Sequence, residues 1–190
     1  WVHYMVGTSF KDGSYLNVMY NRRFEWLDVP FRIQRDVTIP VGTYRYHDLN
    51  LSYITNPSSR VYGRAGYAPQ TFFDGQRTDA NAMLGVRATS RVATEVEYRR
   101  NDVDLPWGAF VANLGTFRLN MAVSPRMTLA VLSQYNSSVD ELSHSVRFNF
   151  IYKPGSDFYL VYDEASSAAP GLPEYRNRQL LAKMTYLLSR

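Results

Sequence analysis

The sequence predicts an all-β protein, an antiparallel up-and-down β-barrel of about eleven strands in this chain. Two observations predict this fold. Apolar and polar side chains alternate along most of the 190 residues. Clusters of turn-forming residues interrupt this pattern, and they mark connections that are alternately short and long along the chain. Successive side chains of a strand point to opposite faces, so alternation is the pattern of a two-sided sheet.

The alternation is clearest in residues 142–153, where even positions are mostly apolar and odd positions mostly polar, with Ile151 as the exception. Residues 91–99 split in the same way, because Val92, Thr94, Val96 and Tyr98 alternate with Ala93, Glu95, Glu97 and Arg99. The predicted strands lie near residues 1–10, 15–26, 43–55, 60–69, 80–89, 91–99, 116–123, 127–136, 142–153, 157–164 and 177–188.

Short turns are predicted at 11–14, 56–59, 89–91, 124–126 and 154–156, and longer connections at 27–42, 70–79, 100–108, 137–141 and 165–176. Bacterial membrane barrels have short periplasmic turns, long outer loops and an even number of strands. An odd count therefore predicts that residues 1–190 form a single region of a larger even-stranded barrel and a C-terminal fragment of a longer chain.

The composition agrees with a transmembrane barrel and excludes other classes. Mean hydropathy is only -0.32, yet a barrel strand faces lipid with just half of its residues, so its apolar signal cancels in the average. No segment approaches the roughly 20 apolar residues of a spanning helix. The chain has no Cys, and its net charge of +4 is spread without a basic run, so we expect no Cys-based metal site and no nucleic-acid partner. No motif implies a cofactor.

Charged residues recur on the polar sides of the predicted strands. They define a predicted lumen-facing set, which indicates a channel or transporter, a side-chain-filled barrel, or a membrane anchor. The expected partners are outer-membrane lipid, a small solute or saccharide, and another part of the same protein or a second subunit. The set consists of Arg23, Glu25, Asp48, Arg64, Arg87, Glu95, Glu97, Arg99, Arg118, Arg147 and Lys183.

Catalytic arrangements have weaker support than a non-enzymatic barrel, and the sequence leaves enzymatic activity open. His144 lies between Ser143 and Ser145, but adjacent strand residues point to opposite faces, so neither serine shares its face. Asp102 and Asp104 fall in a predicted outer loop, and Asp163 with Glu164 at the start of another. Such carboxylates could activate water or bind Ca²⁺, although most loop acids are simply solvated.

Residues 118–190 resemble the C-terminal part of an uncharacterised bacterial outer-membrane barrel family. The resemblance lies in Ser124-Pro125-Arg126-Met127-Thr128-Leu129, Gln134-Tyr135-Asn136, Arg147-Phe148, the run from Tyr152 through Asp157-Phe158 to Glu164, and the closing Leu181 to Leu188. Members of that family often carry an N-terminal domain similar to family 9 carbohydrate-binding modules. The resemblance implies a porin-like location in the outer membrane of a Gram-negative bacterium and assigns no catalytic residue.

Three classes of function remain open from the sequence. The first is an outer-membrane barrel with a polar, charged lumen, acting as channel, transporter or anchor, with a possible link to carbohydrate handling. The second is an outer-membrane hydrolase with its site in the external loops. The third is a soluble β-barrel or sandwich binding protein, in which the apolar faces would enclose a wide cavity that is difficult to fill. The size of that cavity favours the first class.

Overall fold

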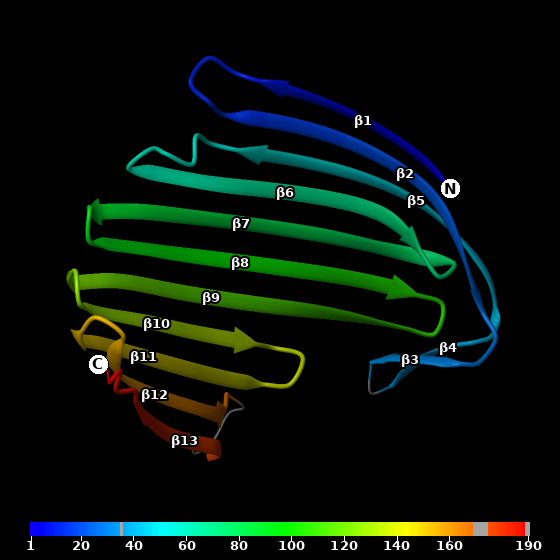
Figure 1. Ribbon diagram of the computed structural model, residues 1–190. Helices are drawn as coiled ribbons and strands as arrows, with labels where there is room; N and C mark the ends of the chain where they lie inside the picture. Colours follow the sequence, from blue (N-terminus) through cyan, green and yellow to red (C-terminus); the bar gives the residue numbers. More distant parts are fainter. Residues whose placement is uncertain (35, 169–174, 189–190) are drawn as a thin grey trace. The chain divides into compact units, whose positions relative to one another are not determined.

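The computed structural model describes residues 1–34, 36–168 and 175–188. Eleven strands form one sheet in the order β1-β2-β5-β6-β7-β8-β9-β10-β11-β12-β13, and β3 pairs with β4 in a separate two-stranded sheet (Figure 1). The strands are β1 Val2–Ser9, β2 Tyr15–Leu27, β3 Phe31–Gln34, β4 Val37–Ile39, β5 Gly42–Ile54, β6 Val61–Phe72, β7 Gly75–Thr89, β8 Val92–Leu105, β9 Gly108–Ser124, β10 Met127–Asn136, β11 Glu141–Lys153, β12 Ser156–Ser167 and β13 Tyr175–Met184.

The main sheet confirms the predicted all-β, antiparallel, up-and-down class and the count of eleven strands. Apart from the step from β2 to β5, each strand of this sheet is hydrogen-bonded to the strand that follows it in the chain. Strands β10 and β11 keep the predicted bounds to within one residue. Period-two alternation therefore located most strands, because it reflects the geometry of an extended backbone.

The pairing register sorts side chains into two faces. Val18 lies opposite both Val6 on β1 and Leu51 on β5, and Leu51 lies opposite Tyr67 on β6. We call this side the apolar face. Arg23 lies opposite Tyr46 on the other side, which we call the polar face. Residues directly opposite one another share a face, so one face stays apolar across successive strands.

Among the described residues, no helix or strand packs on the apolar face, and large side chains on this face are exposed. Val6 is 72% exposed, Val96 56% and Leu180 68%. These residues belong to β1, β8 and β13, so exposure is a property of this face on widely separated strands. Large exposed apolar side chains of this kind are typical of contact with another apolar phase or partner.

Two predicted outer loops are wrong. Residues 70–79 form strand with a tight turn at Phe73 and Asp74, whose φ angles are 44° and 63°, and residues 100–108 lie mostly in β8 and β9. The apolar residues of these segments, Phe72, Val103 and Leu105, occupy positions of the polar face in β6 and β8, so they interrupt the alternation. Strand pairing satisfies backbone N–H and C=O groups whatever the side chains are, so both segments continue as strand.

The structure also differs from the predicted loop 27–42, because part of this segment forms the β3–β4 hairpin. Phe31 pairs with Ile39 and Arg32 with Thr38. The alternation of Val37, Thr38 and Ile39 was a signal for a strand, but three residues are too short to stand out from a loop. The predicted connection 165–176 is shorter at both ends, because β12 extends to Ser167 and β13 begins at Tyr175. Residues 169–174 of this connection lie outside the described residues.

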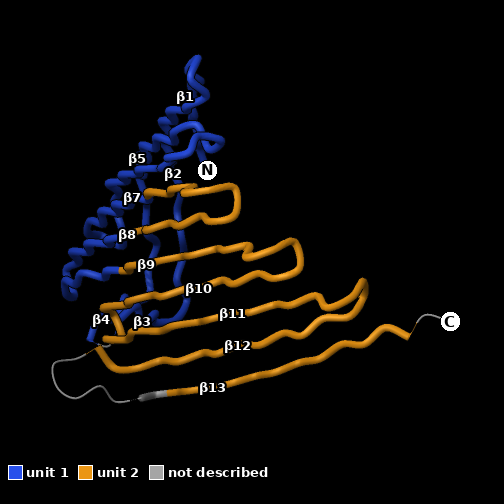
Figure 2. Tube along the Cα trace, turned by 90° about the vertical axis from the view of Figure 1, so that its left-hand side faces the viewer, with its two compact units in different colours: residues 1–83, 99–113 blue, residues 84–98, 114–190 orange. Residues whose placement is uncertain are grey.

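The chain divides into two compact units (Figure 2). Unit 1 comprises residues 1–83 and 99–113, and unit 2 comprises 84–98 and 114–190. Each unit has its own group of polar-face side chains.

Candidate functional site: the polar face

In unit 1 the β3–β4 hairpin lies against the polar face. Val37 and Ile39 pack with Tyr44, Tyr46 and the other buried residues of this cluster, and Ile39 is 0% exposed. The remaining buried members are Phe72, Phe73, Val103 and Leu105. Tyr44 and Tyr46 contact Phe73 edge-to-face, with ring centroids 5.0 and 5.5 Å apart. A hairpin from a long connection is thus anchored on the face that also carries the charges.

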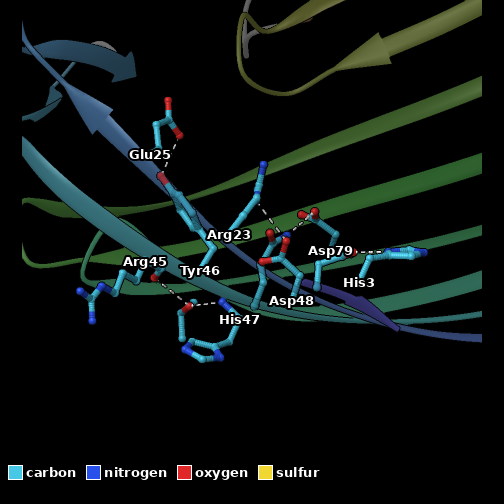
Figure 3. Close-up of polar contacts among 11 residues, drawn as sticks. His3, Arg23, Glu25, Arg45, Tyr46, His47, Asp48 and Asp79 are labelled. Atoms are coloured by element: carbon cyan, nitrogen blue, oxygen red, sulfur yellow. Dashed lines mark hydrogen bonds and ion pairs between the residues drawn. The ribbon is translucent and has the colours of Figure 1, made fainter. Parts of the chain in front are cut away.

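Next to this cluster, β2 and β5 exchange polar contacts (Figure 3). The Tyr46 hydroxyl donates to Glu25 at 3.0 Å, and the Arg23 guanidinium lies over the Tyr46 ring at 4.7 Å. Arg23 also forms an ion pair with Asp48 at 3.2 Å. Arg23, Glu25 and Asp48 therefore lie together on the polar face, as predicted from alternation.

Asp79 on β7 forms a second polar cluster in unit 1. Its carboxylate accepts hydrogen bonds from Gln70 on β6 at 2.9 Å, from Arg77 at 2.7 Å and from Asn101 on β8 at 2.5 Å. Sequence reasoning missed this cluster, because Gln70, Arg77 and Asp79 fell inside a predicted loop. Alternation extended beyond the apolar segment would have placed Arg77 and Asp79 in one strand.

In unit 2, Arg118 on β9 connects to two carboxylates of β8. Its Nη1 lies 3.7 Å from Glu95 and 4.0 Å from Glu97. The side chain of Glu97 is only 5% exposed, whereas that of Arg118 is 43% exposed. The three residues belong to the predicted lumen-facing set, and the structure brings them together.

Arg147 on β11 lies beside Arg118 across β10. Both line one small hollow of about 180 Å³ with Asn120, Ala130 and Ser145. The Ser145 hydroxyl oxygen and the Asn149 amide oxygen are buried and have no hydrogen-bond partner among the described residues. The hollow thus brings two guanidinium groups together with the polar side chains of Asn120 and Ser145.

The other predicted lumen-facing residues lie on the same face without joining one site. Arg64 lies opposite Ile54, and Lys183 lies opposite Tyr159. Arg87 and Arg99 occupy odd positions of β7 and β8, as do Asp79 and Asn101, and therefore share their face. The polar face thus carries arginines, lysine and carboxylates in mixed order.

The proposed catalytic acids are arranged differently from the prediction. Asp102 and Asp104 lie within β8 instead of a loop, and Asp102 forms an ion pair with Arg100 at 2.9 Å. Asp163 and Glu164 lie within β12 on opposite faces, and Glu164 pairs with Arg178 at 3.3 Å. Asp102 and Glu164 thus already have cationic partners, which lowers their value as bases.

His144 has a serine neighbour that sequence spacing did not reveal. Its Nδ1 lies 2.9 Å from the Oγ of Ser133, the residue opposite it on β10. Glu164 lies opposite His144 on β12 but is engaged by Arg178 and by the Tyr162 hydroxyl. A serine hydrolase requires a carboxylate that orients the imidazole, and Glu164 is used elsewhere.

Within the described residues, no group of three or more His, Cys, Asp and Glu side chains is placed to bind a metal ion. The same part of the chain contains no helix long and apolar enough to cross a membrane.

Comparison with known proteins identified solved porin structures. The chain is similar to a KdgM porin with 11% identity, covering 86% of this chain and 82% of that one at a TM-score of 0.39. It is similar to a KdgM porin in complex with disordered oligogalacturonate with 9% identity, coverage of 98% and 91%, and a TM-score of 0.40. For a NanC porin the identity is 12%, the coverage 98% and 99%, and the TM-score 0.44. No family model and no curated protein matches this sequence.

Proposed function

We propose that this chain forms an outer-membrane β-barrel channel, with its apolar face in lipid and its polar face lining a water-filled lumen. The observation that carries the proposal is the division of the sheet. One face presents exposed apolar residues such as Val6, Val96 and Leu180, and the other presents ion-paired Arg, Asp and Glu. Alternation of lipid-facing and lumen-facing residues is the organisation of transmembrane barrels.

The position of the β3–β4 hairpin supports this assignment of the faces. In a soluble barrel or sandwich the apolar face would be the interior, and covering elements would pack on it. In unit 1 the buried residues Val37 and Ile39 pack instead on the side of Arg23 and Tyr46. The hairpin thus occupies the proposed lumen, and the apolar face remains available to lipid.

The solute of this channel is proposed to be small and hydroxylated, such as a saccharide with an acidic group. The hollow beside Arg118 and Arg147 offers guanidinium groups for a carboxylate, together with the polar side chains of Asn120 and Ser145 for hydroxyl groups. Guanidinium and carboxylate form charge-assisted, bidentate hydrogen bonds. The link to an upstream carbohydrate-binding domain stays a prediction.

Three measurements test the channel function. A folded barrel resists detergent until heated, so the chain should migrate differently on electrophoresis before and after boiling, and it should precipitate without detergent. Reconstituted in planar bilayers, it should conduct ions. A monodisperse, detergent-free preparation with no conductance would contradict the proposal and favour the soluble alternative.

Arg147 provides the test of the solute site. Replacing Arg147 by Gln removes a cation from the lumen, so the reversal potential in a salt gradient should move toward cation selectivity. Block by a sugar acid such as galacturonate should weaken as well. The matched control is Arg91→Gln, which lies in a short turn next to β8, and it should leave both quantities unchanged.

A further inference from the structure

The apolar face of unit 1 changes character along β2 and β5. Leu16 and Val18 on β2 lie opposite Tyr53 and Leu51 on β5, so this part of the face is hydrocarbon. Further toward the connection 28–41, the same face carries Arg22 opposite His47 and Arg45 opposite Phe24. Two exposed arginines therefore lie next to the hydrocarbon part of this face, on the side that the proposed function assigns to lipid.

Arg22 and Arg45 line one hollow. Its volume is about 480 Å³, and Trp1, Val2, Phe24 and Thr43 complete its walls together with Arg23. The guanidinium of Arg23 is engaged on the polar face by Asp48. The hollow therefore combines two cationic side chains with apolar and aromatic ones, and its volume lies in the range of ligand sites.

Neither Arg22 nor Arg45 forms an ion pair within the described ranges 1–34, 36–168 and 175–188. Other arginines on the apolar face are neutralised. Arg100 pairs with Asp102 at 2.9 Å, and Arg178 pairs with Glu164 at 3.3 Å. Among the described residues, the chain thus supplies carboxylates for Arg100 and Arg178 and none for Arg22 and Arg45.

We propose that Arg22 and Arg45 bind the phosphate of an anionic lipid headgroup, with Val2 and Phe24 against the first part of its acyl chains. This inference rests on the proposed function, because it needs the apolar face to lie in a membrane. Phosphate accepts bidentate hydrogen bonds from guanidinium, and basic pockets at the edge of a hydrocarbon belt bind lipid headgroups. The long arginine stems can lie along the apolar surface while their charges reach the headgroup.

The test uses the full chain in dodecyl maltoside micelles and native mass spectrometry. Dimyristoyl phosphatidic acid is the probe, and dimyristoyl glycerol, which lacks the phosphate, is the lipid control. We expect a retained phosphatidic acid adduct, and a loss of affinity of about tenfold or more in R22Q/R45Q, since each charge-assisted bond is removed. The matched variant R100Q, which changes an arginine already paired with Asp102 on the same face, should bind as the wild type does.

R22K/R45K keeps both charges but loses the planar guanidinium groups, so it should retain part of the affinity. It also keeps the proposal testable if the Gln variant fails to fold. Equal binding by R22Q/R45Q and wild type would overturn the proposal, as would equal retention of dimyristoyl glycerol. Displacement of the lipid by inorganic phosphate at the same concentration would overturn the lipid assignment in favour of a free-anion site. Heat-modifiable migration and conductance, measured on the same samples, separate failure of this site from failure of the channel function.

Discussion

The guanidinium of Arg118 on β9 lies 3.7 Å from Glu95 and 4.0 Å from Glu97 on β8, and Glu97 is 5% exposed. A buried carboxylate is stabilised by a nearby cation, because desolvation otherwise disfavours its charge. The half-exposed Arg118 thus connects a buried acid with the exposed part of the polar face.

Arg118 and Glu97 should be energetically coupled. R118Q should lower the free energy of unfolding by about 1–3 kcal/mol, and the double variant R118Q/E97Q should lose less than the sum of the single variants. Urea unfolding of protein refolded in lipid vesicles measures this. The control pair is Arg100 and Asp102, whose side chains are 45% and 48% exposed, and its coupling should be at most about 1 kcal/mol. Equal coupling for both pairs would contradict the structural role of Arg118.

The two faces should tolerate charge differently. Val96→Arg places a guanidinium on the apolar face of β8 and should destabilise the membrane-inserted protein by about 2–4 kcal/mol. Asn120→Arg places the same group on the polar face of β9, where water is available, and should change stability little. Urea unfolding in vesicles compares the two variants. A neutral Val96→Arg together with a destabilising Asn120→Arg would mean that the faces are reversed.

The β3–β4 hairpin should detach when its buried contact is reduced. Ile39→Ala removes a fully buried side chain, which costs about 2–5 kcal/mol, and the loss falls on a short two-stranded element. Limited proteolysis should cut between residues 28 and 41 faster, and single-channel conductance should rise if the hairpin narrows the lumen. Thr38→Ala, at an exposed position of the same strand, should have neither effect. Unchanged proteolysis of Ile39→Ala would contradict anchoring of the hairpin.

The turn between β1 and β2 should respond to acid. The Asp12 carboxylate accepts hydrogen bonds from the Ser14 hydroxyl at 2.7 Å and the Ser14 backbone N–H at 2.9 Å, and these bonds lower the pKa of Asp12 below its ordinary 3.8. Because the folded-state pKa is lowered, this stabilisation is present above the ordinary value and is lost as pH falls through the lowered pKa. NMR titration should show the shift in wild type and a smaller one in Ser14→Ala. An identical Asp12 pKa in both proteins would contradict it.

Much of the fold was predictable from residues close in sequence. The alternation in 142–153 located β11, because the two-residue period of an extended backbone is local. The same rule placed Arg118, Glu95 and Glu97 on one face. It failed at 70–79 and 100–108, where the backbone continues as strand although Phe72, Val103 and Leu105 place apolar side chains on the polar face.

By itself the sequence determined which residues alternate, and therefore that this protein is an antiparallel sheet with an apolar and a polar face. Only the tertiary structure decided which polar-face residues meet, such as Gln70 and Asn101 at Asp79, and that Val37 and Ile39 cover Tyr46. The physical reason is that the two-residue period is a property of each strand alone. Which residues become cross-strand partners, and where a hairpin packs on the sheet, depend instead on the register between segments far apart in the chain.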